Sequence, residues 1–144
     1  MDVRPPYLLL ADDDPEDRQL LSDEFTHQNP GIGVHHAADG QEVLQYLNNC
    51  EVGNLPLVLV LDYQMPDLNA PQILLRLTAN SSFRRIVKVV WSSSQRIKDM
   101  EDCKRLGASH YLVKPSTVEE LKRSVRQLTA ILNFASGSAG RRAE

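Results

Sequence analysis

Residues 57–62 read Leu-Val-Leu-Val-Leu-Asp, an apolar run that ends at a carboxylate. Two other runs have the same character: residues 7–11 (Tyr-Leu-Leu-Leu-Ala) precede three aspartates, and residues 87–91 (Val-Lys-Val-Val-Trp) precede a serine. Strands of a parallel sheet are covered by helices on both faces, so their sequences are apolar almost throughout. The three runs therefore predict central strands of a parallel sheet.

Strand and helix patterns alternate outward from these runs along the chain. The predicted strands are residues 7–11, 32–37, 57–61, 86–91 and 109–113. Between and after them, apolar residues recur at helical spacing, at Leu20, Leu21 and Phe25; Val43, Leu44 and Leu47; Ile73, Leu74 and Leu77; Ile97, Met100 and Leu106; and Leu121, Val125, Leu128 and Ile131. This alternation predicts an α/β fold, a doubly wound five-stranded parallel sheet for which we expect the strand order 2-1-3-4-5.

The size and charge of the chain narrow its classes of function. Its 144 residues suit one domain, with a core at about residues 7–133 and a flexible tail of small polar residues at 134–144. A formal net charge of −3 disfavours nucleic acid as a partner, and no apolar stretch approaches the roughly 18 residues of a membrane span. The N-terminus lacks a signal-peptide core, and the two cysteines have no metal-ligand spacing. We expect a cytoplasmic protein of one domain, residues 1–144, that binds neither nucleic acid nor membrane.

Polar side chains follow the predicted strands at the points where the strands end. Asp12 and Asp13 come after the first strand, Asp62 after the third, Ser92 after the fourth and Lys114 after the fifth. The carboxyl ends of parallel strands meet at one edge of the sheet, where ligands of such folds bind. We therefore expect these five side chains to lie close together.

The expected group has the chemistry of a phosphoryl acceptor. Three carboxylates at close range raise the pKa of at least one of them unless a cation intervenes, and Mg²⁺ (or Mn²⁺) binds oxygen ligands of this kind. Lys114 supplies a positive charge and Ser92 a hydroxyl, both suited to phosphoryl oxygens. A carboxylate nucleophile in this setting forms an aspartyl phosphate, and Asp62 is the expected acceptor because it follows the central strand.

These motifs resemble the receiver domain of two-component response regulators, the CheY-like family, over about residues 7–133. The stretches that carry the resemblance are residues 8–14 (LLLADDD), 59–67 (LVLDYQMPD), 89–93 (VVWSS) and 107–115 (GASHYLVKP). The resemblance implies a flavodoxin-like (βα)5 fold. It also implies a signalling protein that is no enzyme beyond its own phosphorylation and dephosphorylation.

The resemblance assigns a role to each residue of the expected site. It implies that Asp62 is the phosphoacceptor, that Asp12 and Asp13 bind the metal, and that the backbone carbonyl of Gln64 is a further metal ligand. Asp62 and the Asp12-Asp13 pair each stand directly after an apolar run, as the family's pattern requires.

The resemblance also assigns the residues that respond to the phosphoryl group. Ser92 matches the hydroxyl switch residue, thirty positions after Asp62, and Lys114 matches the family's lysine, fifty-two positions after it. Tyr111 matches the aromatic switch residue that follows the hydroxyl. Kinship further implies a cis peptide bond between Lys114 and Pro115.

Partners follow from the same resemblance. The segment 14–18 (Asp-Pro-Glu-Asp-Arg) and the long loop at residues 48–54 are similar to stand-alone receivers that partner bacterial phytochrome-type histidine kinases. We expect a sensor histidine kinase of this type as partner, and a homodimer through the fourth helix, fifth strand and fifth helix. The chain departs from the family in having Ala70, followed by Pro71, where glycine is usual, and Ser92 for the commoner threonine.

Other interpretations stay open at this point. The acidic run could simply favour a helix N-terminus, Asp62 could be a turn residue, and Lys114-Pro115 could end a strand. A Mg²⁺-dependent phosphatase with an aspartyl intermediate would use Asp12 or Asp14 as nucleophile and needs a further acidic pair at a strand end after the lysine. The chain could also be a receiver-like interaction module that works without phosphate.

Overall fold

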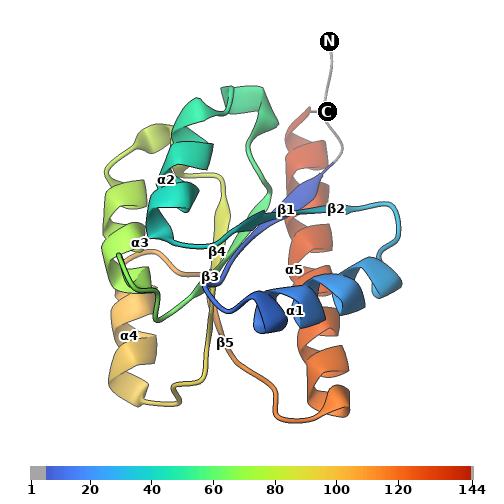
Figure 1. The fold of residues 1–144 in the computed structure, drawn as a ribbon. Coiled ribbons are helices and arrows are strands. Elements are labelled where there is room, and N and C mark those ends of the chain that lie inside the picture. Colours follow the sequence, from blue (N-terminus) through green and yellow to red (C-terminus); the bar gives the residue numbers. More distant parts are fainter. Residues whose placement is uncertain (1–5, 144) are drawn as a thin grey trace.

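Residues 6–143 are described by a computed structural model, in which five strands alternate with five α-helices (Figure 1). The five strands form one parallel sheet in the order β2-β1-β3-β4-β5, so the predicted fold and strand order are confirmed. The elements are β1 (Tyr7–Ala11), α1 (Pro15–Gln28), β2 (Gly33–Ala37), α2 (Gly40–Asn49), η1 (Val52–Asn54), β3 (Val58–Asp62), α3 (Ala70–Thr78), η2 (Ser81–Phe83), β4 (Val87–Ser92), α4 (Ile97–Arg105), β5 (His110–Val113) and α5 (Val118–Ala143).

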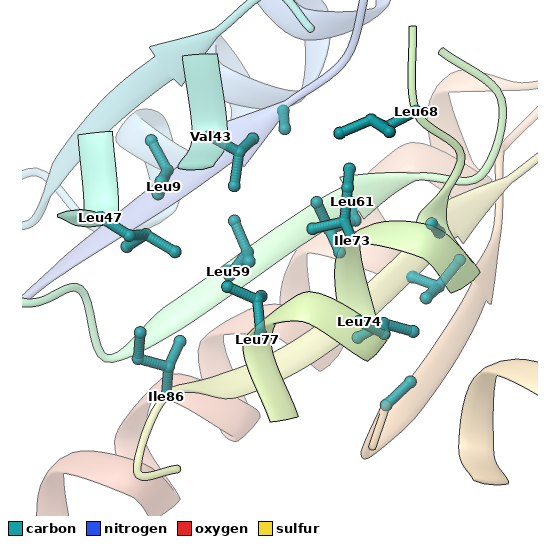
Figure 2. Close-up of a cluster of buried hydrophobic side chains, with 14 of the residues drawn as sticks. Leu9, Val43, Leu47, Leu59, Leu61, Leu68, Ile73, Leu74, Leu77 and Ile86 are labelled. Carbon is teal, nitrogen blue, oxygen red and sulfur yellow. The ribbon is translucent and has the colours of Figure 1, made fainter. Parts of the chain in front are cut away.

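Helices cover both faces of the sheet and make two apolar layers. Figure 1 shows α2, α3 and α4 on one face and α1 and α5 on the other. Because successive strand residues point to opposite faces, Leu59 and Leu61 enter the first layer while neighbouring residues of β3 enter the second. Figure 2 shows the side chains of Leu59 and Leu61 against Leu77 and Ile73 of α3. Every residue of β1 and β3 is buried, which explains their continuous apolar sequences.

Two strands end one residue later than predicted. Asp62 is the last residue of β3, where it pairs with Trp91, and Ser92 is the last residue of β4, where it pairs with Val113. The reason is that hydrogen bonding of the sheet continues into the polar residue that ends each apolar run. Both candidate site residues therefore stand on the end of a strand and not in a loop.

The helices that follow the strands begin with side-chain caps. The Asp14 carboxylate accepts the backbone N–H groups of Glu16 and Asp17, and Pro15 is the first residue of α1. Asn69 and Gln72 form a reciprocal capping box at the start of α3. Ala70 and Pro71, where the chain departs from the family's usual glycine, open α3, and proline there removes no helical hydrogen bond.

The last helix is longer than the sequence predicts. Residues 134–143, expected as a flexible tail, continue α5 to Ala143. Extension of an existing helix needs no new nucleus, so a helix that packing has started can continue through this segment, although Gly137 and Gly140 disfavour helix and only the alanines favour it. Within the described part of the chain, no helix combines the length and apolar character needed to cross a bilayer.

Candidate functional site

Three carboxylates meet at the carboxyl end of the two central strands. Asp12 follows β1 and Asp62 ends β3, and these strands are neighbours in the sheet. Asp12 is 0% exposed and Asp62 is 6% exposed, whereas Asp13 is open to solvent. One oxygen from each of the three residues lies within 4.8 Å of the others. The structure thus brings the three predicted acids together.

Lys114 is the cation of this group. Its Nζ lies 2.9 Å from Asp12 Oδ2 and 3.4 Å from Asp62 Oδ1, and it also lies 2.9 Å from Asp17 Oδ2. Burial alone would lower the pKa of Lys114, but its hydrogen bonds to Asp12 and Asp17 outweigh burial and raise that pKa. The lysine therefore stays charged while largely removed from water.

Asp17 was not among the residues that the sequence singled out for the site. It lies in the first turn of α1, where an acid is expected for its effect on the helix dipole alone. The start of α1 directly after Asp14 carries it back over the end of the sheet toward Lys114. Only the dense run of acids around Pro15 could have drawn attention to it.

The environment of Asp62 disfavours its charged form. Burial is the largest cause and the charge of Asp12 adds to it, while Lys114 acts in the opposite direction, and together they raise the pKa of Asp62 to about 7. A carboxylate with such a pKa gains from any further positive charge placed beside it. Its surroundings are therefore prepared for a cation.

Asp12 is fixed by three donors. Its Oδ1 accepts the backbone N–H of Asp14 at 2.9 Å, and its Oδ2 accepts the indole N–H of Trp91 at 3.2 Å as well as the ammonium of Lys114. The sequence predicted that Trp91 packs in the sheet, and it does so at 2% exposure. Its hydrogen bond to Asp12 had no signal in the sequence, because it depends on the register between strands that are far apart in the chain.

Ser92 and Gln64 border an open cleft above the acids. The cleft has a volume of about 650 Å³, and its lining includes Asp13, Asp62, Gln64, Ser92 and Lys114. Ser92 is buried, and its Oγ accepts the backbone N–H of Ser94 at 3.0 Å. Gln64 is exposed at the rim. The cleft is large enough for a phosphoryl group together with a hydrated ion.

Tyr111 lies apart from the cleft and contacts the loop after β4. Its hydroxyl donates to the carbonyl oxygen of Ser94 at 3.0 Å, and its ring packs against the apolar layer under α3 and α4.

The peptide bond between Lys114 and Pro115 is trans, so the expected cis bond is wrong. Trans is the lower-energy form of such bonds by about 0.5–1 kcal/mol. The N–H of Lys114 donates to the Ser92 carbonyl at 2.7 Å and continues the pairing of β4 with β5.

The sequence also matches a model of a known protein family. The model of the response regulator receiver domain matches residues 8–126. The chain belongs to this family.

Relatives of this receiver domain occur in archaea and plants. It is 27% identical over 126 residues to the probable methanogenesis regulatory protein FilR2 of Methanothrix harundinacea, covering 86% of this chain and 81% of that protein. It is 30% identical over 125 residues to the two-component response regulator ARR5 of Arabidopsis thaliana, covering 81% and 67% respectively.

Solved structures share the fold of this receiver domain. The Mn²⁺-bound response regulator Rcp1 superposes with a TM-score of 0.77 at 21% identity, covering 86% of this chain and 91% of that one. The phosphorylated cyanobacterial phytochrome response regulator RcpA gives 0.77 at 23% identity, with 87% and 91% covered. A two-component response regulator of Legionella pneumophila gives 0.75 at 26% identity, with 90% and 99% covered.

The donor atoms of this receiver domain suit a hard divalent cation. Three carboxylates contribute oxygen atoms within 4.8 Å of one another, and the described residues near them contribute no thiolate or imidazole. One of the three, Asp62, is poorly stabilised as an anion by the protein alone. Residues and ion therefore fit in both geometry and charge.

Proposed function

We propose that this receiver domain takes a phosphoryl group from a sensor histidine kinase onto the carboxylate of Asp62. Asp12, Asp13, Asp62 and the backbone carbonyl of Gln64 would hold Mg²⁺ (or Mn²⁺). The observation that carries the proposal is the contact of Lys114 with Asp62 inside a group of three carboxylates. A lysine beside an acceptor carboxylate is the expected means of neutralising phosphoryl oxygens at that position.

In the reaction, an oxygen of Asp62 forms a bond to phosphorus while the bond from phosphorus to the donor's histidine nitrogen breaks. Lys114 lies 3.4 Å from this carboxylate and offsets the charge on the phosphoryl oxygens. Ser92 keeps one hydroxyl proton free to donate to such an oxygen, since its Oγ accepts from Ser94. A metal ion held by Asp12, Asp13 and Asp62 would supply further positive charge for phosphoryl transfer.

Phosphorylation acts as a switch in this proposal, with Ser92 and Tyr111 as the responding residues. The new group adds about −1.5 to −2 charges beside Ser92, and Tyr111 is joined to the same loop through Ser94.

In this proposal the protein performs no chemistry beyond gaining and losing its own phosphoryl group, and does so in the cytoplasm. Glu119 and Glu120 lie exposed in the first turn of α5, which does not supply the strand-end acidic pair of the phosphatase alternative.

The proposal includes a phytochrome-type kinase as donor and a homodimer. The first rests on the segment at residues 14–18 and on the similar fold of RcpA. The second rests on apolar side chains that lie open on the fourth and fifth helices, Ile97 at 71% and Phe134 at 75% exposure. Light scattering after gel filtration tests the dimer, and a monomer both with and without phosphate would contradict it.

Acetyl phosphate with Mg²⁺ tests the acceptor directly. Intact mass should show one acid-labile phosphoryl group on the parent and none on Asp62→Asn or in the presence of a chelator. An adduct of equal size on both proteins would show that Asp62 is not the acceptor. A folded parent that takes up no group from acetyl phosphate or from a phytochrome-type kinase would favour a module that signals without phosphate.

A further inference from the structure

Asp99 is a buried acid of α4 that the proposed reaction does not use. It is 9% exposed, and among the side chains described for residues 6–137 no lysine, arginine or histidine forms an ion pair with it. Its partners are two hydroxyls: Ser94 donates to Oδ2 at 2.7 Å, and Tyr63 donates to Oδ1 at 3.3 Å. A buried carboxylate is costly unless hydrogen bonds satisfy it, and here both oxygens are used to hold other residues.

The two donors come from the two loops that flank the acceptor. Tyr63 directly follows Asp62 at the end of β3. Ser94 lies two residues after Ser92, in the loop between β4 and α4. Through its two carboxylate oxygens, Asp99 therefore joins the loop that follows Asp62 (residues 63–69) to the loop between β4 and α4 (residues 93–96).

Ser94 passes this anchorage on to both switch residues. Its backbone N–H donates to Ser92 Oγ at 3.0 Å, and its carbonyl accepts the hydroxyl of Tyr111 at 3.0 Å. Its own Oγ donates to Asp99 and accepts the N–H of Arg96 at 3.2 Å. Every polar group of Ser94 is thus engaged, and its side-chain proton goes to Asp99.

The direction of these bonds decides what Ser92 can do. A hydroxyl has one proton and two lone pairs, and the N–H of Ser94 occupies a lone pair of Ser92. The remaining proton is free to be donated to an oxygen in the cleft. A phosphoryl group needs such a donor, because its oxygens only accept hydrogen bonds. If Ser94 moves, Ser92 loses the donor that sets this orientation.

We propose that Asp99 is a positioning residue for phosphoryl transfer: through Ser94 it holds the hydroxyl of Ser92 as a donor, and through Tyr63 it fixes the loop after Asp62. This inference rests on the proposed function and adds the element that aligns the site. Asp99 lines the same cleft, but among the described side chains it forms no ion pair with Lys114 and is not one of the three clustered carboxylates. Its effect therefore belongs to alignment and not to metal binding.

The test compares Asp99→Asn with Asp102→Asn, an acid three residues along the same helix that pairs with Arg105. Transfer from acetyl phosphate at saturating Mg²⁺ should slow about 3- to 10-fold in D99N, the loss expected for one hydrogen bond of ordinary strength, and stay at the parent rate in D102N. Mg²⁺ affinity should stay within about two-fold of the parent in both variants, because neither removes a metal-binding acid. The single tryptophan, Trp91, bonds to Asp12 and provides a fluorescence signal for this titration.

Ser94→Ala and the double variant D99N/S94A identify the route. If Asp99 acts through Ser94, S94A slows transfer by itself and D99N adds little to it. Tyr63→Phe tests the second contact with a smaller change. Hydrogen exchange of residues 92–96 should be faster in D99N than in D102N, in the absence of any phosphoryl donor.

The outcomes separate the two proposals. A parent that takes up no phosphoryl group overturns the proposed function and with it the kinetic role of Asp99. A reactive parent with an equally reactive D99N, or with equal slowing in D102N, overturns the positioning role alone. Slowing that adds fully in D99N/S94A contradicts the route through Ser94.

Discussion

Lys114 and Lys88 are both removed from water at opposite ends of the sheet, and their surroundings differ completely. Lys114 follows β5 at the carboxyl end, where three carboxylates lie within 3.4 Å of its Nζ. Lys88 stands near the start of β4 at 6% exposure, and its Nζ donates to the carbonyl of Phe83 at 2.8 Å. Among residues 6–143 no carboxylate pairs with Lys88.

The comparison separates burial from compensation. Burial lowers the pKa of Lys88, whereas the hydrogen bonds that Lys114 donates to Asp12 and Asp17 overcome burial and raise the pKa of Lys114. Relative to a lysine in water, the charged form is therefore favoured at Lys114 and disfavoured at Lys88. At the carboxyl end, carboxylates compensate the charge of Lys114, whereas at the amino end the uncompensated charge of Lys88 lowers stability.

The largest effect should come from Lys114→Met, which breaks the compensated end. Removing the cation leaves two buried carboxylates facing each other and should lower the free energy of unfolding by about 3 kcal/mol near pH 8 without metal. The loss should shrink near pH 5, because Asp62 then takes up a proton. Urea denaturation measures both values, with the exposed Lys104→Met as control. An equal loss of stability in Lys104→Met would show that the effect does not come from the carboxylates around Lys114.

Asp62→Asn should give the next largest effect, and it should be stabilising. A carboxyl whose pKa rises from 3.8 to about 7 on folding contributes stability at low pH that is lost as pH rises between these values. The uncharged variant avoids this loss, so in chelator it should exceed the parent by about 1–3 kcal/mol near pH 8 and by little near pH 4. Urea denaturation across this range checks the sign. A variant less stable than the parent near pH 8 would contradict it.

Lys88→Met sharpens the comparison from the other end. A lysine with a lowered pKa contributes stability above its ordinary pKa and loses it as pH falls, so its charge is a cost at neutral pH. Replacement by methionine, which is of similar length, should therefore raise the free energy of unfolding by about 1 kcal/mol, even though the hydrogen bond to Phe83 is lost. Thermal unfolding near pH 7 measures the change. A destabilised variant would show that the bond to Phe83 matters more than the buried charge.

Asp17→Asn should have the smallest effect. Lys114 keeps Asp12 and Asp62 as partners, and Asp17 is 36% exposed, so solvent screens its contribution. We expect a loss below about 1 kcal/mol that disappears in high salt. A loss as large as that of Lys114→Met would mean that Asp17 is the principal partner of the lysine.

The central strands were predictable because burial on both faces leaves a direct record in the sequence. The run at residues 57–61 is apolar throughout, and the polar residues that follow each run converge at one edge of the sheet as parallel topology requires. β2 is different, because most of its residues are exposed and its pattern is correspondingly weak. Predictability thus follows the degree of burial.

Contacts between elements were not predictable in the same way. The bonds from Trp91 to Asp12, from Lys114 to Asp17 and from Ser94 to Asp99 join side chains whose spacing matches no local repeat. They depend on strand register and on the direction in which a helix leaves the sheet. The length of α5 was missed for another reason, since propensity alone does not mark where a cooperative helix stops.

Lys114 follows the last strand, so a chain still on the ribosome contains Asp12 and Asp62 before it contains their cation. β1 and β3 are neighbours, and their docking brings these two carboxylates together. Repulsion between them opposes early closure of the sheet's centre. The centre of the sheet therefore gains its compensating cation only once residue 114 has left the exit tunnel.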